Sequence, residues 1–429
     1  MGDALFRSRH ELAASQLDQL RALLTELLPA NRFYARKLGD AGVGFDVASL
    51  ADYERRFPLT TKAELVEDQR LAPPYGTNLT HPLECYTRFH QTSGTTGAPL
   101  RWLDTPESWD WMVGSWTEVF RAAGATPADR VLFAFSFGPF IGFWLAYEAA
   151  ERLGCLCVPG GGMSSSGRLR LLLDNAITVL CCTPTYALRL AEVAAEEGFD
   201  LSQGTVRTLV VAGEPGGSIP ATRARIESLW PGARVFDHHG MTEVGPVTHE
   251  CPAQPGRLHV IESAYLAEVI DPETGRPVSP GATGELLLTT LGRMGSPLLR
   301  YRTGDLVRPS FPEPCACGRY DMALEGGILG RADDMVVVRG VNIFPSAVED
   351  VIRAQKGIAE YEVRIERRGA LSELAVRVEP SPEATGDRAL VERLERALQA
   401  AFSLRVPVTV AEAGSLPRFE MKARRWIRT

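Results

Sequence analysis

The pattern of apolar and polar positions divides the chain into three regions. Residues 11–28 carry leucines at helical spacing, which predicts an amphipathic helix. Between about 85 and 240, short apolar runs alternate with helical stretches, and this alternation predicts a mostly parallel sheet covered by helices. The runs expected to form strands are VLFAFSF, CLCVPGG, TVLCCTP, TLVVAGE and ARVFDHH.

The pattern changes near residue 258. Strand-like runs separated by turn-rich segments predict a small antiparallel barrel up to about residue 310. From about residue 330 the order strand, helix, strand, strand, helix, strand predicts a compact α+β domain. We therefore expect a large α/β N-terminal domain over 1–329, with parallel sheets, helices and the barrel, followed by a small α+β C-terminal domain over 330–429.

Composition narrows the class of protein. Hydrophobic residues make up 45% and charged residues 23%, as in ordinary globular proteins, and the formal net charge is -7. This charge argues against nucleic acid or an anionic membrane surface as a partner. We see no secretory signal and no apolar run of roughly 18 residues that would span a bilayer, so we expect a cytoplasmic location.

One short segment has the composition of a phosphate-binding loop. Residues 92–97, here called the phosphate segment, place two glycines among four hydroxyl side chains: Thr92, Ser93, Gly94, Thr95, Thr96 and Gly97. Glycines let backbone N–H groups approach an anion, and hydroxyls add further donors. No GK[ST] motif follows, which distinguishes the segment from a P-loop. Taken alone, a surface loop of the same composition is an equally good interpretation.

Four further motifs follow in order: HHGMTE (238–243), YRTGD (301–305), GRADDMVVVRG (330–340) and LPRFEMKARR (416–425). Together with TSGTTG they resemble the signature motifs of the adenylate-forming superfamily of acyl-CoA synthetases, luciferases and adenylation domains. GEP (213–215), RGVNIFPS (339–346) and CACGR (315–319) are most similar to the phenylacetate–coenzyme A ligase branch. The resemblance covers about residues 85–429.

The resemblance implies a role for each matching residue. The phosphate segment would hold the ATP phosphates, Thr242 the α-phosphate, Glu243 a Mg²⁺ ion and Asp305 the ribose hydroxyls. Lys422 would bridge the substrate carboxylate and the α-phosphate, where its charge would stabilise the transition state. Further nucleotide contacts would come from Glu214, Pro215, His239, Gly240, Met241 and Arg331. Asp333 matches the position about which the small domain rotates between the two half-reactions.

The chain departs from the family pattern at three positions. Ala98 stands where the family commonly has lysine, His239 where it usually has tyrosine, and Met421 where it often has glycine. Two roles are open for His239: stacking on adenine in place of the tyrosine, or contact with a polar group of the substrate.

The resemblance also places the acyl pocket. Its expected lining is Phe137, Gly138, Phe140, Trp144, Ala212, Gly213 and His238. Aromatic walls with glycines beside them suit a flat aromatic acid. His238 and Glu214 add polar groups, from which we expect a ring bearing hydroxyl or amino substituents.

Cysteines and histidines form a candidate metal site. Cys315 and Cys317 lie in a Pro- and Gly-bounded loop, and Cys251 and His259 lie about 60 residues earlier. Such soft ligands suit a structural zinc ion, with His249 as a reserve ligand. A pair of free thiols in a turn is the alternative.

These observations predict an AMP-forming ligase that activates an aromatic carboxylic acid with ATP and Mg²⁺, releases pyrophosphate and transfers the acyl group to coenzyme A. A carrier-protein thiol or an amine is the alternative acceptor. A nucleotide-binding regulator without chemistry is disfavoured because Glu243, Asp305 and Lys422 are all present. The resemblance also implies a homodimer.

Overall fold

The structure is a computed structural model. It describes residues 6–27, 30–92, 99–135, 137–311, 313–339, 341–368, 371–387, 389–419 and 423–428. The chain forms two compact units, and each unit combines two stretches of sequence. The first unit comprises Met1–Gly162 and Asp237–Gly327, and the second comprises Met163–Phe236 and Ile328–Thr429.

Four helices begin the first unit: α1 (Arg9–Leu27), α2 (Arg32–Asp40), α3 (Leu50–Arg56) and α4 (Lys62–Leu71). Helix α1 confirms the predicted amphipathic helix, since its leucines at helical spacing are buried. Helix α4 begins with a capping box between Thr61 and Glu64, which fixes Lys62 as its first residue. Among the described residues, no helix combines the length and apolar character needed to cross a membrane.

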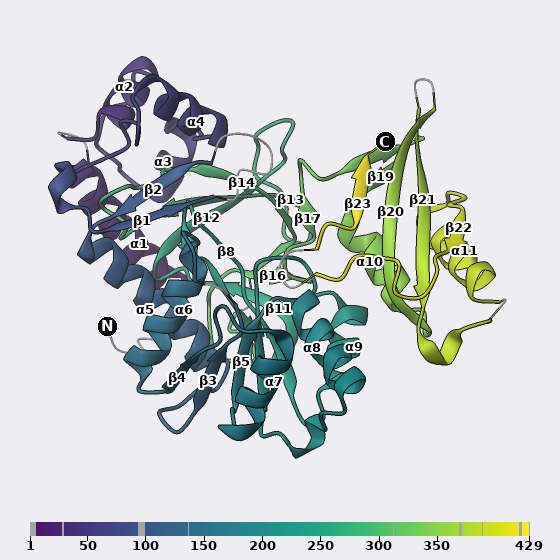
Figure 1. Ribbon diagram of the computed structural model, residues 1–429. Coiled ribbons are helices and arrows are strands. Elements are labelled where there is room, and N and C mark those ends of the chain that lie inside the picture. Colours follow the sequence, from purple (N-terminus) through teal and green to yellow (C-terminus); the bar gives the residue numbers. More distant parts are fainter. Residues whose placement is uncertain are drawn as a thin grey trace. The chain divides into compact units, whose positions relative to one another are not determined.

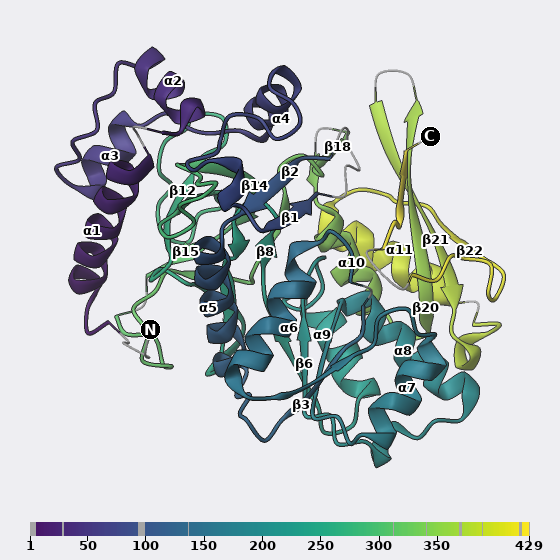
Figure 2. The same ribbon diagram turned by 60° about the vertical axis from the view of Figure 1, so that its left-hand side comes forward.

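A hairpin, two helices and a parallel strand pair complete the N-terminal part of this unit. Strands β1 (Arg88–Gln91) and β2 (Arg101–Asp104) pair antiparallel. Helices α5 (Pro106–Ala122) and α6 (Ile141–Leu153) lie side by side (Figure 2). Strands β3 (Arg130–Phe133) and β4 (Leu156–Pro159) pair in parallel.

The rest of the first unit is antiparallel. One sheet has the order β10 (Thr248–Cys251), β11 (Gln254–Val260), β16 (Ala323–Glu325) and β15 (Pro309–Ser310). A second contains β12 (Tyr265–Ile270), β13 (Gly284–Thr290) and β14 (Tyr301–Val307). A short hairpin joins β8 (Gly240–Met241) to β9 (Gly245–Pro246). The antiparallel region predicted from the sequence therefore consists of separate sheets.

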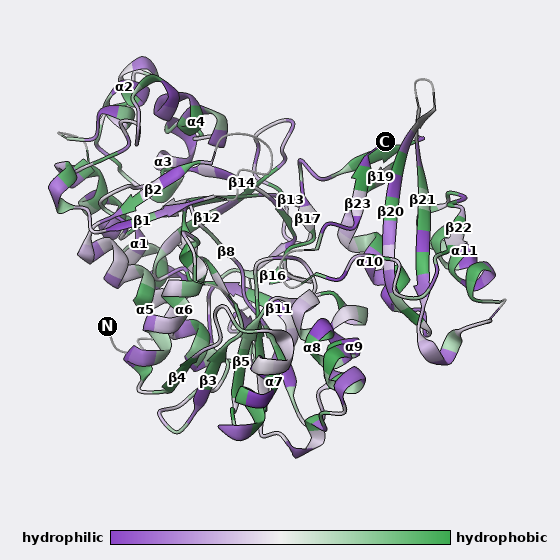
Figure 3. Ribbon diagram, viewed as in Figure 1, coloured by the Kyte–Doolittle hydropathy of each residue, from purple (hydrophilic) through white to green (hydrophobic). Residues whose placement is uncertain are grey.

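The second unit begins with strands alternating with helices. Strand β5 (Val179–Cys182) pairs in parallel with β6 (Thr208–Val211), whose other neighbour is β7 (Arg234–Asp237). Every residue of β5 and β6 is buried, and Figure 3 shows β5 in hydrophobic colours. Such continuous apolar runs are typical of strands covered on both faces. Helix α7 (Ser165–Asp174) precedes β5, while α8 (Pro184–Glu197) and α9 (Pro220–Leu229) follow β5 and β6.

The C-terminal part of the second unit is a four-stranded sheet with two helices. Its strand order is β22 (Val408–Val410), β21 (Leu371–Pro380), β20 (Ile358–Arg368) and β23 (Trp426–Arg428). The long strands β20 and β21 run side by side in Figure 1. Apolar side chains of α10 (Pro345–Arg353) and α11 (Ala389–Phe402) pack on this sheet and form one core.

One predicted strand of this region pairs outside the four-stranded sheet. The MVVVRG run forms β18 (Val336–Val338), which pairs with β19 (Val341–Ile343) as a hairpin and does not join the four-stranded sheet. The sheet edge beside β20 is instead occupied by β23, which directly follows the LPRFEMKARR motif. Trp426 packs against the core, which gives this short strand an apolar anchor. The remaining short strand, β17 (Gly330–Arg331), precedes the hairpin.

Candidate active site and metal centre

Several candidate residues directly follow parallel strands. Ala212, Gly213, Glu214 and Pro215 follow β6, and His238 and His239 follow β7. Ligands of α/β folds bind outside the carboxyl ends of strands, where loops are free to vary. Gly213 has φ 93, a conformation that glycine adopts without steric cost. Residues 212–215 and residues 238–239 therefore lie at the ends of strands where α/β folds bind their ligands.

Glu243 lies in the turn between β8 and β9. Its side chain is buried, and its Oε1 is 2.9 Å from Nζ of Lys62, the first residue of α4. Thr242, its neighbour in the turn, is partly exposed. The Lys62 ammonium is the positive partner of this buried carboxylate, and a carboxylate oxygen is the type of ligand that Mg²⁺ prefers.

Asp305, in β14, lies against His239. Nε2 of His239 is 2.9 Å from Oδ2 of Asp305, and both side chains are largely buried. The backbone of His239 is fixed through Thr248, whose hydroxyl accepts the His239 N–H at 3.0 Å. Nδ1 of His239 is buried and has no hydrogen-bond partner among the described residues. The structure thus brings together two residues that the sequence predicted for nucleotide binding.

His238 is held in one tautomer. Its Nδ1 is 2.6 Å from the carbonyl oxygen of Thr248, which can only accept, so Nδ1 carries the proton. Its ring contacts that of Trp116 at 4.4 Å between centroids. Burial lowers the pKa of His238 to about 4, which leaves a neutral ring at neutral pH.

Both carboxylate oxygens of Glu214 accept backbone N–H groups. Thr185, in α8, donates at 2.9 Å to one oxygen, and Ala423 donates at 2.8 Å to the other. Arg425 reinforces the same connection by donating to the Thr185 hydroxyl at 3.3 Å and pairing with Glu360 at 2.7 Å. Glu214 therefore fixes the chain directly after Lys422.

Arg331 and Asp333 pair with each other. Nε of Arg331 is 2.8 Å from Oδ1 of Asp333, and both side chains are exposed. Arg331, the predicted ribose contact, is the last residue of the short strand β17. Asp333, the predicted hinge residue, follows two positions later.

The predicted pocket aromatics form a ring cluster before and within α6. Phe137 contacts Trp144 edge-to-face at 4.9 Å between centroids, and Phe140 contacts Phe143 at 6.2 Å. The indole N–H of Trp144 donates to the carbonyl of Gly138 at 2.9 Å, which orients the indole. Trp144 exposes 37% of its surface, so this cluster presents aromatic surface to solvent.

Some predicted residues lie outside the described residues, namely Ser93–Gly97 of the phosphate segment and Lys422. The residues on either side are described: the Thr92 N–H donates to the Leu100 carbonyl at 3.0 Å, and the Leu100 N–H donates to the Thr92 hydroxyl at 3.0 Å. Gln91 of β1 pairs with Arg101 of β2.

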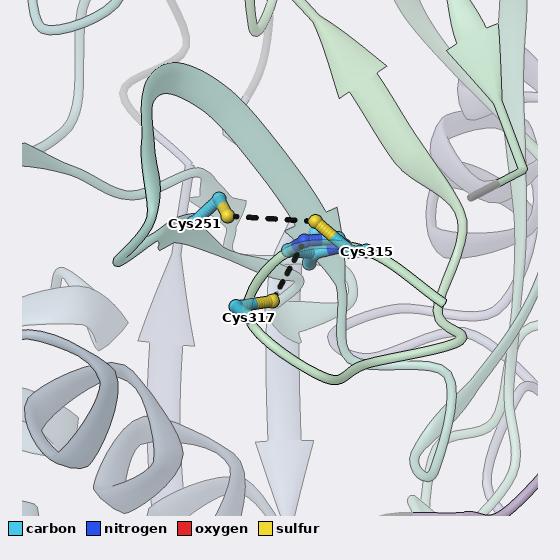
Figure 4. A group of neighbouring side chains, drawn as sticks. Cys251, Cys315 and Cys317 are labelled. Carbon is cyan, nitrogen blue, oxygen red and sulfur yellow. Dashed lines mark hydrogen bonds between the residues drawn. The ribbon is translucent and has the colours of Figure 1, made fainter. Parts of the chain in front are cut away.

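Four side chains converge as the metal-site prediction requires. The ligand atoms of Cys251, His259, Cys315 and Cys317 all lie within 4.8 Å of one another. The Cys251 and Cys315 sulfurs are 3.7 Å apart, and Sγ of Cys317 is 3.5 Å from Nε2 of His259. In Figure 4 the labelled sulfurs point toward a common centre. The group does not include His249.

These separations fit tetrahedral zinc. With Zn–S of about 2.3 Å and Zn–N of about 2.0 Å, tetrahedral geometry requires S···S distances of about 3.8 Å and S···N distances of about 3.5 Å. Nδ1 of His259 lies 3.3 Å from the carbonyl of Asp321, which directs Nε2 toward the sulfurs. The β10–β11 hairpin supplies two ligands, and the loop before β16 supplies the other two.

Sequence reasoning missed two residues near Glu243. Lys62 precedes it by about 180 residues, and the local signal beside it is the T-x-x-E capping box of residues 61–64, which predicts a helix start and no functional role. Arg293, which donates to the carbonyls of Thr242 and Glu243, carried no signal in the sequence. Both contacts depend on long-range folding.

Comparisons with known proteins agree with the motifs. The family model described as AMP-binding enzyme matches residues 86–295, and the AMP-binding enzyme C-terminal domain matches residues 340–429. The chain is 33% identical to a phenylacetate-coenzyme A ligase of Thermus thermophilus, over 96% of this chain and 95% of that protein. It is also 33% identical to a phenylacetate-coenzyme A ligase of Escherichia coli, over 96% and 94%.

Solved structures agree as well. A 2-hydroxyisobutyryl-CoA ligase in the postadenylation state matches with a TM-score of 0.93 and 29% identity, over 100% of this chain and 94% of that chain. The predicted fold class is thereby confirmed. ATP-dependent adenylation of a carboxylic acid and transfer to coenzyme A follow from these relatives. The chain belongs to the phenylacetate–coenzyme A ligase family of the adenylate-forming superfamily and is an AMP-forming carboxylic acid–CoA ligase.

Proposed function

We propose that the acid is aromatic and bears a hydroxyl or amino substituent. The observation that carries this proposal is the ring cluster around Phe137, Phe140 and Trp144, whose flat surfaces suit stacking on a planar ring. His238, neutral and held in one tautomer, would offer a hydrogen bond to a substituent. A bare phenyl ring would not need such a group.

The residue roles follow from charge and position. A carboxylate oxygen of the acid attacks the α-phosphorus of ATP, a new O–P bond forms, and the bond to pyrophosphate breaks. Lys422 and Thr242 would stabilise charge on the α-phosphate, and the phosphate segment would hold the leaving pyrophosphate. Glu243 would hold Mg²⁺, which neutralises phosphate charge when bound.

The second half-reaction forms the thioester. The sulfur of coenzyme A attacks the acyl carbonyl, AMP leaves with the electron pair of the broken C–O bond, and the thiol proton passes to solvent. We place the domain boundary at 329/330 and the hinge at Asp333, so that residues 330–429 reorient between the two steps.

We also propose that Cys251, His259, Cys315 and Cys317 hold a structural zinc ion. The Cys251–Cys315 and Cys317–His259 separations match tetrahedral values and all four ligand atoms lie within 4.8 Å of one another, and four protein ligands would leave no position for substrate. The ion would join the β10–β11 hairpin to the loop before β16.

The test is ATP consumption, with AMP and pyrophosphate detected, across substituted benzoates, phenylacetates and cinnamates, with and without coenzyme A. We expect turnover that needs coenzyme A and is fastest with hydroxy- or amino-substituted rings. 2-Hydroxyisobutyrate belongs in the panel, since the ligase with a TM-score of 0.93 is named for that acid. A preference for it would contradict the aromatic proposal, and AMP formation without thioester would indicate another acceptor.

A further inference from the structure

The guanidinium of Arg293 is fully buried and anchored on a carboxylate. Nε donates to Oδ1 of Asp104 at 2.6 Å and Nη2 donates to Oδ2 at 2.7 Å, and neither side chain has any exposed surface. The indole ring of Trp102 lies 5.2 Å from the guanidinium carbon. This bidentate pairing fixes the plane of the guanidinium and leaves Nη1 free to donate elsewhere.

Nη1 donates to the turn that carries the candidate metal ligand. It lies 2.9 Å from the carbonyl oxygen of Thr242 and 2.9 Å from that of Glu243. The turn is short, since Met241 pairs with Gly245 across the β8–β9 hairpin. Two of its carbonyls are therefore held by a single side chain.

Asp104 connects this turn to the β1–β2 hairpin. It is the last residue of β2 and pairs with Arg88, the first residue of β1. The Arg293–Asp104 pair thus links the β1–β2 hairpin to the turn that carries Thr242 and Glu243. Both connections lie within the first unit.

Buried charge pairs are expensive to desolvate and are often no more stabilising than apolar residues of similar volume. Mg²⁺ requires near-ideal octahedral geometry with ligands at about 2.0–2.1 Å, so small displacements of a carboxylate weaken its binding. An arrangement that fixes the backbone of this turn therefore serves the adenylation step.

We propose that Arg293 is a positioning residue for adenylation, because it holds the Thr242–Glu243 backbone at a fixed place relative to strand β2. This inference rests on the proposed role of Glu243 as the Mg²⁺ ligand. Thioester formation releases AMP and handles no pyrophosphate, so it should depend little on Arg293.

The test variant is Arg293→Lys, which keeps the charge but lacks the fork that reaches Asp104 and both carbonyls together. Asp104→Asn is a milder second variant, in case the first does not fold. Arg300→Lys is the matched control, because Arg300 and Glu268 form another buried pair, 2.7 Å apart, whose further contact is to the Phe57 carbonyl.

Each variant is titrated with Mg²⁺ in ATP–pyrophosphate exchange, using the acid that turns over in the panel, and is separately given preformed acyl-adenylate and coenzyme A. We expect Arg293→Lys to raise the Mg²⁺ midpoint at least 5-fold and slow exchange at least 10-fold, since small misplacements cost on the order of 10²-fold in rate. Thioester formation should stay within about 3-fold of wild type, and Arg300→Lys should leave the Mg²⁺ midpoint unchanged.

Equal loss in both half-reactions with an unchanged Mg²⁺ midpoint would overturn the positioning role, as would an equal shift in Arg300→Lys. Glu243→Gln in the same Mg²⁺ titration distinguishes failure of the proposed Mg²⁺ role of Glu243 from failure of the positioning role of Arg293. If it does not shift the midpoint, the metal role of Glu243 is wrong and the positioning role falls with it. If it does and the Arg293 and Asp104 variants do not, only the positioning role is wrong.

Discussion

Burial governs the chemistry of single histidines in this enzyme. His90 and His238 are almost fully buried, and burial lowers the pKa of each to about 4 from an ordinary 6.5. His90 stacks on Trp109 at 5.1 Å between centroids. Protonating either ring places a charge in a buried site, so it lowers the free energy of unfolding.

We predict that stability falls as pH is lowered from about 6.5 to about 4. In this window the unfolded chain binds protons at these histidines and the folded chain does not, so each costs at most about 3 kcal/mol. His90→Gln should reduce the dependence of the unfolding free energy on pH by about one proton, measured by denaturant unfolding across this range. The exposed His10, changed to Gln, is the control, and equal slopes for both variants would contradict the prediction.

Asp305 should matter for ATP and not for coenzyme A. A carboxylate accepts both ribose hydroxyls, and charged hydrogen bonds contribute about 1.5–3 kcal/mol each. Asp305→Asn should therefore raise the KM for ATP by roughly 10-fold or more, with the KM for coenzyme A unchanged in steady-state kinetics. Asp271→Asn, in an exposed turn of the same unit, controls for general damage. An unchanged KM for ATP would exclude the ribose role.

At the scale of elements, the proposed zinc ion would hold a hairpin and a loop together. Cys317→Ser should abolish bound zinc and lower the midpoint of thermal unfolding by at least about 5 °C, because loss of a structural metal is among the most destabilising changes. Zinc content by atomic spectroscopy and thermal unfolding measure both effects. The exposed Cys85, changed to Ser, is the control. Wild-type protein that contains no zinc, or a Cys317→Ser variant that unfolds at the same temperature as wild type, would contradict the proposal.

Glu214 connects α8 to the segment after Lys422. Glu214→Ala removes the acceptor for the Ala423 N–H, so we expect adenylation to slow by about 10-fold while preformed acyl-adenylate still reacts with coenzyme A. Pyrophosphate exchange and thioester formation measure the two steps. If Glu214 instead contacts the substrate, the order of preference across the acid panel will change, so the panel is repeated with the variant.

At the scale of the whole molecule, the proposed mechanism has residues 330–429 reorient about Asp333 between the two half-reactions. Proline fixes φ near −65°, so Asp333→Pro should block this change. We expect pyrophosphate exchange to persist and overall thioester formation to fall at least 10-fold. Asp333→Ala, which also loses the pair with Arg331 but keeps backbone freedom, is the control. Equal loss in both variants would argue against a hinge.

The amino-acid sequence by itself determined the parallel strands, the amphipathic helices and the family. Their signals are local, since a strand with both faces covered is an unbroken apolar run, as in β5 and β6. The motifs implied the reaction through their resemblance to the adenylate-forming superfamily, and each motif is a short local run of particular residue types. The C-terminal strand β23 was missed because its three residues form a strand only beside β20.

Tertiary structure decided which of these residues meet. Lys62 reaches Glu243 from a helix far earlier in the chain, and Arg293 joins Asp104 to the Thr242–Glu243 turn. The four candidate metal ligands were named from the sequence, but the pairing of β11 with β10 and β16 is what brings their ligand atoms within 4.8 Å of one another. Spacing along a chain carries no distance in space for residues 60 or 180 positions apart, because that distance is set by the packing of everything between them.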